Sequence, residues 1–338
     1  MSAKTAERKE ASRRVAGVAG EGRTRAAKRS GARLKPLTVG IVGAGRLGTA
    51  IGRALAACGH NVVAVVARQS KHAKRAASLI DTRPRALTNA QLEALPPVDL
   101  LFITTPDDAI AETAARLAAF KRTDGSNRPV ALHMSGGTSS AALAPLRECG
   151  FYIGSMHPLA SISEPLSGAE NLRSAFYCLE GDRKAVSTAR RLVRELGGKS
   201  FSIETSDKAL YHAAAVISCN HLVALFDLAV ELLARCHISK SDALAVLIPL
   251  LRNTCENIAS RGTQRALTGP FVRADVATVR RHLSALEAQN PSEEVAVYTL
   301  LGRRSLRLAQ ESGADAARLS EIALELDRAD GKTGKSLT

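Results

Sequence analysis

Short apolar runs alternate with stretches of helical periodicity between residues 35 and 205. The apolar runs lie at Leu37–Val42, Val62–Val66, Leu100–Thr105 and Val130–Met134. Runs that are apolar on both faces are typical of parallel strands that helices cover on both sides. The alternation therefore predicts an α/β domain with a doubly wound, mostly parallel sheet.

Two more strand-like segments continue this pattern, "FYCLEGD" from Phe176 and "KSFSIET" from Lys199. The segment between them, "RKAVSTARRLVREL", has the spacing of a helix with one apolar face. That face carries Ala185, Ala189, Leu192, Val193 and Leu196. We expect both strands to extend the same sheet.

The chain changes character near residue 205. Helical periodicity continues almost unbroken from Ser206 to Asp330, beginning with a long apolar-rich segment at Ala209–Ala234. We therefore expect a Rossmann-like domain at 35–205 and an all-α domain at 206–330. Because helices that are apolar on more than one face usually pack against something, we also expect a homodimer.

The N-terminal segment, residues 1–34, has the composition of a disordered tail. It holds ten lysines and arginines against three glutamates, so it supplies +7 of the formal net charge of +15. With almost no large apolar side chain, it cannot offset the entropy lost on ordering. A basic arm can bind nucleic-acid phosphates, but a solvated extension is the simpler interpretation and we expect no nucleic-acid partner.

The rest of the composition is that of an ordinary globular chain, with 45% hydrophobic and 23% charged residues. No apolar run reaches the eighteen or so residues that span a bilayer, so we expect no membrane association. The six cysteines form no C-x-x-C pair and no His/Cys spacing of a zinc site. We expect a cytoplasmic protein without a bound metal.

The stretch "TVGIVGAGRLGTAIGRAL" places a glycine-rich motif between the first strand and a helix. The pattern G-x-G-x-x-G falls on Gly43, Gly45 and Gly48. In this context the glycines allow a tight turn, close approach to a pyrophosphate, and packing of helix on strand. The helix N-terminus then faces the phosphates with unpaired N–H groups. The predicted dinucleotide site is this loop, in which Ala44, Arg46 and Leu47 lie between the glycines.

The end of the second strand indicates which dinucleotide binds. An acidic residue there would accept hydrogen bonds from the adenosine ribose, but the strand ends in Arg68, Gln69, Ser70 and Lys71. Guanidinium and hydroxyl donors suit a 2′-phosphate, so NADP is favoured over NAD. The alternative is a basic helix start that is only solvated. After the strand at Leu100–Thr105, we expect Thr105 and Pro106 to border the cofactor and Asp107 and Asp108 to serve a helix start, without a catalytic role.

Six motifs together resemble the bacterial family of Rossmann-like proteins that carry a DUF2520 domain. They are "GIVGAGRLGTAIGRALAACGH", "TTPDDAI", "LHMSGGTSSAAL", "GSMHPLAS", "DKALYHAAAVISCNHLVAL" and "ALTGPFVRADVATVRRHL". The resemblance implies a Rossmann domain followed by a helical domain, an oxidoreductase activity and relatives such as prephenate dehydrogenases. One departure is Ala274 in "VRAD", where the family usually has glycine, which puts a tight turn at this position in question.

Ser135 in "HMSGG" and His157 in "GSMHPLA" form the first candidate catalytic pair. Both are expected just past strand ends, on the side where doubly wound sheets bind ligands. Prephenate dehydrogenases are similar here, and this similarity implies that His157 is the acid or base of hydride transfer. The alternative for His157 is a loop histidine bonded to backbone.

Two further groups of candidates come from the helical half. Lys208 and His212 lie one turn apart, and a lysine with a polar partner four residues on resembles the catalytic helix of hydroxyacid dehydrogenases. The alternative for Lys208 is a solvated lysine near a helix start. Asn220 lies further round the same helix and is a candidate substrate ligand. In "LTGPFVRADVATVRRHL", Arg273 could bind a substrate carboxylate, whereas Asp275 is best interpreted as a helix cap.

Two function classes remain open from the sequence. The favoured one is an NADP-dependent dehydrogenase or reductase acting on a small carboxylate-bearing carbonyl, hydroxyl or imine compound. The alternative is a non-catalytic NADP-binding sensor or assembly protein, because the fold alone does not separate the two.

Overall fold

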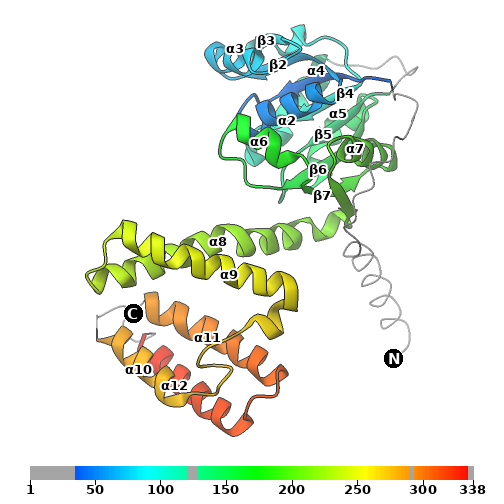
Figure 1. The fold of residues 1–338 in the computed structure, drawn as a ribbon. Helices are drawn as coiled ribbons and strands as arrows, with labels where there is room; N and C mark the ends of the chain where they lie inside the picture. The colour runs from blue at the N-terminus through cyan, green and yellow to red at the C-terminus, as the bar shows by residue number, and fades with distance from the viewer. Residues whose placement is uncertain (1–34, 121–127, 289–292, 334–338) are drawn as a thin grey trace, which may run out of the picture. The chain divides into compact units, whose positions relative to one another are not determined.

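The computed structural model describes residues 35–120, 128–288 and 293–333 of the 338-residue chain (Figure 1). The chain divides into two compact units, Met1–Lys208 and Ala209–Thr338, which we call the sheet unit and the helical unit. The predicted tail, residues 1–34, lies outside the described residues.

The sheet unit contains eight strands among its described residues. They are β1 (Thr38–Val42), β2 (Asn61–Ala67), β3 (Arg85–Thr88), β4 (Leu100–Ile103), β5 (Val130–His133), β6 (Tyr152–Leu159), β7 (Phe176–Gly181) and β8 (Lys199–Ser202). The strand order is β3-β2-β1-β4-β5-β6-β7-β8, and neighbouring strands are parallel except for the antiparallel pair β6 and β7. This confirms the predicted α/β class.

Helices cover both faces of this sheet. The α-helices are α2 (Arg46–Ala57), α3 (Ser70–Ser78), α4 (Ile110–Phe120), α5 (Ala144–Glu148), α6 (Pro165–Leu172) and α7 (Arg183–Glu195). Short 3₁₀ helices are η1 (Asn89–Ala94), η2 (Asp107–Ala109), η3 (Ser140–Leu143) and η4 (Thr205–Asp207). Side chains from α2, α3, α6 and α7 fill one apolar cluster, and those from η1, α4, η3 and α5 fill the other.

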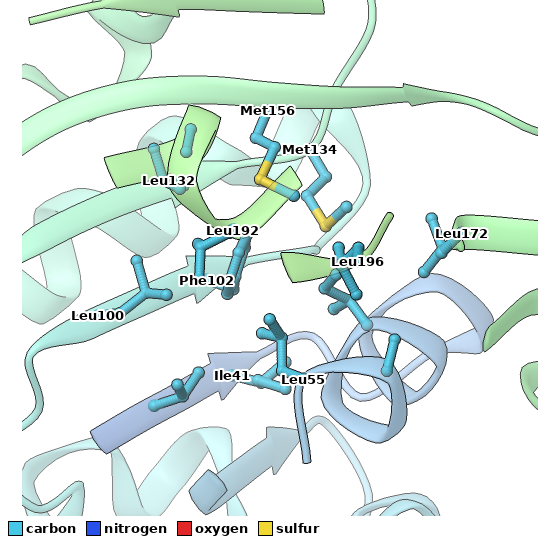
Figure 2. Close-up of a cluster of buried hydrophobic side chains, with 14 of the residues drawn as sticks. Ile41, Leu55, Leu100, Phe102, Leu132, Met134, Met156, Leu172, Leu192 and Leu196 are labelled. Atoms are coloured by element: carbon cyan, nitrogen blue, oxygen red, sulfur yellow. The ribbon is translucent and has the colours of Figure 1, made fainter. Parts of the chain in front are cut away.

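The first cluster joins strands that are far apart in the sequence. Figure 2 shows Phe102 of β4, Met156 of β6 and Leu192 of α7 directed into the same space. Each of these side chains is fully buried. Burial of this kind contributes roughly 1.5–3 kcal/mol for each large apolar side chain, so this cluster stabilises the sheet and the helices on it together.

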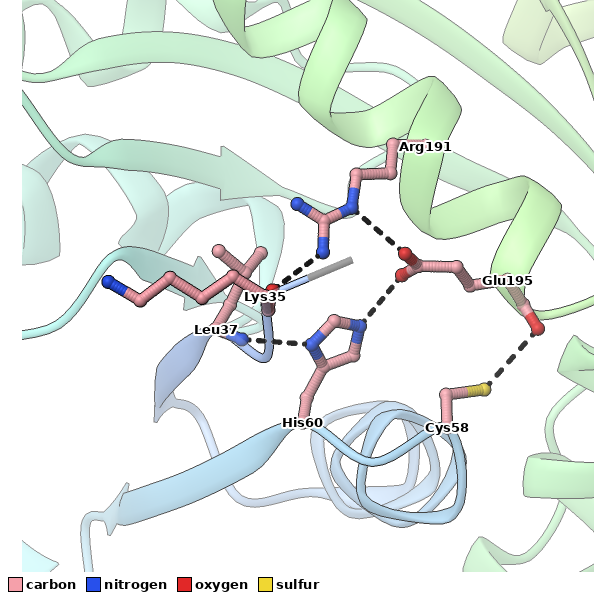
Figure 3. Close-up of polar contacts among 6 residues, drawn as sticks. All are labelled: Lys35, Leu37, Cys58, His60, Arg191 and Glu195. Atoms are coloured by element: carbon pink, nitrogen blue, oxygen red, sulfur yellow. Dashed lines mark hydrogen bonds and ion pairs between the residues drawn. The ribbon is translucent and has the colours of Figure 1, made fainter. Parts of the chain in front are cut away.

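A polar network closes the sheet unit where the chain enters β1 (Figure 3). His60 is 3% exposed; its Nδ1 accepts the Leu37 N–H at 3.2 Å and its Nε2 lies 2.8 Å from Glu195. Arg191 donates to Glu195 at 2.9 Å and to the Lys35 carbonyl oxygen at 2.9 Å. Both ring nitrogens of His60 have hydrogen-bond partners, so the network has a structural role and connects the start of β1 to α7.

The helical unit follows with α8 (Lys208–Arg235), α9 (Lys240–Ala266), α10 (Val276–Glu287), α11 (Glu293–Glu311) and α12 (Ala316–Thr333). Its core joins α10, α11 and α12 through buried side chains such as Val279, Val295, Ile322 and Leu326. Asp275 caps α10 by accepting the Thr278 N–H at 3.0 Å. Within the described residues no strand follows Ser202.

The expectation that no apolar segment is long enough to span a bilayer is wrong. Among the described residues, the helical segment Thr205–Arg235 is long and apolar enough to cross a membrane, with a mean hydropathy of 1.8 over 18 residues. Uncharged polar residues such as Asn220 interrupt the run of apolar residues, so the length of the unbroken run did not reveal this segment. They do not lower its mean hydropathy enough to exclude a span. A single helix of this kind is weak evidence for a membrane span, and the absence of membrane association stays a prediction.

Candidate functional site

The glycine-rich loop after β1 has a geometry that only glycine allows at two of its positions. Gly43 has a φ of 108°, in the left-handed region, and a Cβ there would lie 2.5 Å from the Thr104 carbonyl carbon. At Gly48 a Cβ would lie 2.2 Å from the Gly43 carbonyl oxygen. These are the turn and the helix-on-strand packing that the G-x-G-x-x-G spacing predicts.

The middle glycine of the motif faces open space. A Cβ at Gly45 would meet no heavy atom within 4 Å. Gly45 is also the N-cap of α2, where no side chain caps the helix and no acidic residue lies in the first turn. Unpaired N–H groups and the positive end of the helix dipole therefore face this space, which suits an anion such as a pyrophosphate.

A cavity of about 570 Å³ adjoins this helix N-terminus. Its lining includes Gly45, Arg46 and Thr49 at the start of α2, and His72 and Arg75 from α3. The Arg46 guanidinium also donates to the Ser163 carbonyl oxygen at 3.4 Å. The cavity thus presents basic and hydrogen-bonding groups that suit a phosphate-bearing ligand, together with one acidic residue, Glu164.

The end of β2 offers a second uncapped helix start. Arg68 and Gln69 are exposed, and Ser70 is the first residue of α3. No side chain caps α3 and its first turn holds no acidic residue. The residues predicted to bind a 2′-phosphate therefore lie where a helix dipole would support that role.

The segment after β4 packs against the glycine-rich loop. The Thr104 hydroxyl donates to the Gly43 carbonyl oxygen at 2.7 Å, which fixes the turn. The Thr105 hydroxyl oxygen is buried and has no hydrogen-bond partner among the described residues. Pro106 is exposed and precedes η2. These positions border the loop, as expected from their place in the sequence.

A row of polar side chains crosses three neighbouring strands near the carboxyl end of the sheet. His133 of β5 pairs in register with Ser155 of β6, and Ser155 pairs with Glu180 of β7. The three side chains are 0%, 1% and 2% exposed. Because side chains alternate between faces along a strand, the row lies on the face covered by α4, η3 and α5.

Glu180 ties three segments together. Its carboxylate accepts the Ser140 N–H and the Ser140 hydroxyl, both at 2.7 Å, and the Thr205 hydroxyl at 3.1 Å. Ser140 begins η3, and Thr205 begins η4, three residues before Lys208. A buried carboxylate is costly unless its oxygens are bonded in this way, so Glu180 fixes the approach of the chain to α8.

Lys208 lies within the sheet unit and is 1% exposed. Its Nζ donates to the Ser155 hydroxyl at 2.6 Å, which joins Lys208 to the polar row. Burial lowers the pKa of Lys208, while Cys178, Glu180 and Asp107 oppose that shift. The ammonium is therefore held inside the unit and does not face solvent.

Ser135 lies just past β5, as the sequence predicts, and Asp107 holds it. The Ser135 hydroxyl donates to Asp107 at 2.6 Å and accepts the Thr138 N–H at 2.9 Å. Asp107 lies in the first turn of η2, as expected, and its carboxylate also accepts the Ser135 hydroxyl, a contact that the sequence did not predict. Ser155 also donates to the Ser135 carbonyl oxygen at 3.4 Å, so Ser135 and Lys208 are linked through Ser155.

His133 is a neutral imidazole inside this cluster. Its Nδ1 accepts the Ser135 N–H at 3.2 Å, so the ring proton lies on Nε2. Burial lowers the pKa of His133 to about 4, and the Lys208 charge acts in the same direction. His133 is thus a fixed hydrogen-bonding group at neutral pH.

The remaining predicted residues lie in different places. His157 was expected past a strand end but lies inside β6, two residues beyond Ser155 and therefore on the same sheet face. His212 and Asn220 lie on α8, and Arg273 is exposed before α10, all within the helical unit. The structure brings Ser135 and Lys208 together; the roles of His157, His212, Asn220 and Arg273 stay predictions.

Sequence reasoning overlooked His133, Glu180 and Ser155. Each is a polar residue in an otherwise apolar strand, as in "VALH", "IGSM" and "FYCLEG", and that was the available signal. Their common role depends on the register of three strands, which local spacing does not give.

Family models match both halves of the chain. A Rossmann-like domain model matches residues 23–158, and the model of DUF2520, a domain of unknown function, matches residues 175–305. The second match begins before β7, so it includes the end of the sheet as well as helices. No curated protein matches the chain.

Solved structures share the fold across most of the chain. A candidate NADP oxidoreductase from Bacteroides fragilis is 22% identical, with a TM-score of 0.63 over 80% of this chain and 98% of that one. A protein from Thermotoga maritima is 22% identical, with a TM-score of 0.64 over 81% and 99%. A reductive aminase from Aspergillus terreus, in complex with NADPH and ethyl-5-oxohexanoate, is 16% identical, with a TM-score of 0.52 over 88% and 95%.

Proposed function

The chain belongs to the family of Rossmann-like and DUF2520 domain-containing proteins, and from this premise we propose that it is an NADP-dependent oxidoreductase. Its substrate in this proposal is a small carbonyl, hydroxyl or imine compound that carries a carboxylate. The observation that carries the proposal is the open, uncapped N-terminus of α2 at Gly45. The NADPH held by the Aspergillus terreus enzyme of the same fold supports it.

The residues present fit the cofactor at both of its phosphate groups. Gly45 leaves room for a pyrophosphate at the start of α2, and Arg68 and Ser70 offer cationic and hydroxyl donors for a 2′-phosphate. When bound, NADP supplies the hydride donor or acceptor. The chain itself must hold the substrate and move one proton at the substrate oxygen or nitrogen.

We assign the proton transfer to His157. It is half-buried and lies on the sheet face of the polar row, whereas His133 and Lys208 are enclosed. Lys208 then acts through Ser155 as a positioning residue, and Asp107 holds Ser135.

Two variants test the cofactor site separately. Gly45→Ala adds a methyl group in open space, so it should keep the thermal stability and weaken NADPH and NADH equally, because both carry the pyrophosphate. Arg68→Ala should weaken NADPH alone, by about tenfold to a hundredfold, or 1.5–3 kcal/mol for a lost charge-assisted bond. Binding is measured by titrating the fluorescence of the reduced cofactor.

The matched control is Arg190→Ala, which removes an exposed arginine of α7 that is bonded to Ser202 on the far strand of the sheet. It should change neither affinity. If Gly45→Ala and Arg68→Ala both bind NADPH as the wild type does, the cofactor proposal is wrong.

A third variant tests catalysis. A panel of 2-oxo acids, 2-hydroxy acids and cyclic imines is screened by the absorbance of NADPH, and His157→Asn should lower turnover by about two to four orders of magnitude while cofactor affinity is kept. Normal NADPH binding with no turnover on any member of the panel would favour the sensor alternative.

A further inference from the structure

A second cavity of the sheet unit shares no residue with the cavity beside Gly45. Its volume is about 700 Å³, and volumes of roughly 300–1,000 Å³ are typical of small-molecule sites. We call it the basic cavity, because four of its seven lining side chains are cationic. The lining consists of Arg128, Arg147, Tyr152, Asp182, Arg183, Lys184 and Ser187. Neither the proposed cofactor site nor the polar row uses any of them.

The basic cavity lies at the edge of the sheet opposite the glycine-rich loop. The loop follows the carboxyl end of β1, whereas Arg128 lies two residues before β5 and Tyr152 is the first residue of β6. Strands β1, β4, β5 and β6 are parallel, so these two residues mark the amino ends of the strands. Strand β7 is antiparallel to β6, so the start of α7 reaches the same edge. The basic cavity is therefore separate from the predicted dinucleotide site.

The one acid of the basic cavity is already paired. One oxygen of Asp182 accepts Arg147 at 2.8 Å, and the other accepts the Ile153 N–H at 2.9 Å. None of the other three cationic side chains of the cavity lies in an ion pair with a carboxylate of the described ranges. The basic cavity thus holds an excess of three positive charges, which repel one another and attract an anion.

Two guanidinium groups of the basic cavity are fixed in place. Arg128 donates to the Gly150 carbonyl oxygen at 2.8 Å, and its guanidinium lies 4.3 Å from the centre of the Tyr152 ring. Arg147 is held by Asp182. A guanidinium group carries more N–H groups than these contacts use, and a side chain that is already ordered loses less entropy when it binds a ligand. Both arginines are therefore prepared to donate to an anion.

The other two cations begin α7. Arg183 and Lys184 are the first two residues of this 13-residue helix, and both side chains are exposed. No acidic residue lies in the first turn and no side chain caps the helix, so the positive end of its dipole adds to the positive potential of the cavity. The Ser187 hydroxyl offers one more donor on the same helix.

We propose that the basic cavity binds a small molecule that carries two phosphate groups. The two fixed guanidinium groups suit the paired oxygens of one phosphate, and the two cations of α7 are the donors for the other. Phosphate is favoured over carboxylate because each phosphate group carries up to two negative charges, which matches the excess positive charge with only two groups. The ligand binds without competing with a dinucleotide, since the two cavities share no residue.

Calorimetric titration of the full chain tests the proposal with two probes. Inorganic pyrophosphate carries adjacent phosphate groups, and fructose 1,6-bisphosphate carries separated ones, so the tighter of the two shows which spacing the cavity takes. The tighter probe should bind at least about tenfold more tightly than inorganic phosphate, because the second group is held near its donors once the first has bound.

The variant Arg183→Ala/Lys184→Ala removes the two exposed cations at the start of α7. It should weaken the tighter probe by about tenfold to a hundredfold, because charge-assisted hydrogen bonds are lost. The matched control is Arg190→Ala/Arg194→Ala, which removes two exposed cations of the same helix that do not line the basic cavity. It should bind the probe as the wild type does. Thermal unfolding checks that both variants are folded.

The variants also distinguish the basic cavity from the start of α2. Pyrophosphate bound beside Gly45 would have the same affinity in both double variants, so equal affinities in all three proteins overturn the proposal. A wild type that binds neither probe, or that binds inorganic phosphate as tightly, overturns it as well. Binding of a single-stranded oligonucleotide that is lost in Arg183→Ala/Lys184→Ala, with no binding of either probe, would show a nucleic-acid surface and also overturn it.

Discussion

The sheet unit and the segment Ala209–Ala266 of the helical unit, which holds α9 and all of α8 but its first residue and which we call the helical arm, use the same apolar residue types with opposite results. Leu192 on α7 is 0% exposed because it packs in the closed apolar cluster of the sheet unit (Figure 2), whereas Leu250 on α9 is 62% exposed. Both leucines lie on regular α-helices whose sequences mix apolar and polar residues. The comparison teaches that a hydrophobic pattern tells which residues need burial, and that only the assembled structure tells what buries them.

The largest effect is expected where the sheet unit buries charge. Glu180→Ala removes the acceptor of Ser140 and Thr205 and leaves Lys208 without a nearby buried anion, so we expect the free energy of unfolding to fall by about 3–5 kcal/mol. Urea denaturation of the full chain measures this. Glu256→Ala, an exposed acid of the helical arm, should stay within about 0.5 kcal/mol of the wild type. A cost for Glu180→Ala as small as that would show that the polar row does not hold the unit together.

A second effect concerns leucines of the same size. Leu192→Ala should cost about 2–5 kcal/mol because it opens a cavity in a closed cluster. Leu250→Ala should change the free energy of unfolding by no more than about 0.5 kcal/mol, because Leu250 is 62% exposed. Urea denaturation of both variants measures the two costs, and equal costs would show that Leu192 is not enclosed by its cluster.

The comparison also explains which features the sequence predicted. The sheet, its helices and the loop from Gly43 to Gly48 follow from local periodicity and fixed spacing, and the fold class is confirmed. A strand was expected to end before His157, since "HP" resembles a turn, but β6 continues to Leu159. His133, Ser155 and Glu180 lie side by side because of the register of their strands, which pairs residues 22 and 25 positions apart in the sequence. No local sequence pattern encodes that register.

The third prediction concerns the protonation of His133, which is buried in the sheet unit. The pKa of His133 is about 4 in the folded chain and 6.5 when exposed, so between these values the unfolded chain binds the extra proton. The free energy of unfolding should therefore fall by about 3 kcal/mol as the pH drops from 6.5 to 4, while above 6.5 this stabilisation is fully present.

The variant His133→Asn isolates this effect, because its amide oxygen can still accept the Ser135 N–H. Urea midpoints measured from pH 4 to pH 7 should depend less on pH in His133→Asn than in the wild type. His221→Asn, which replaces an exposed histidine of the helical arm, should keep the wild-type dependence. Equal curves for all three proteins would show that His133 is not enclosed.

The smallest effect concerns a turn of the helical unit outside the helical arm. Ala274 has a φ of 50° and is 2% exposed, so the turn that glycine would ease is formed with alanine. The Asp275 N–H closes it on the Pro270 carbonyl oxygen at 2.8 Å. Ala274→Gly relieves about 1 kcal/mol of left-handed strain but loses a buried methyl group of similar value, so the net change should lie within about 0.5 kcal/mol of zero.

Ala309 is the matched control for this turn, because it packs in the same apolar cluster as Ala274, is 0% exposed and lies in the regular helix α11. Ala309→Gly loses the same methyl group and relieves no strain, so it should cost about 1.5–2 kcal/mol when the helical preference of alanine over glycine is added. Thermal unfolding of the two variants should thus differ by at least about 1 kcal/mol. Equal costs would mean that Ala274 is not strained in this turn, because the burial of the two methyl groups is the same and only the backbone conformation differs.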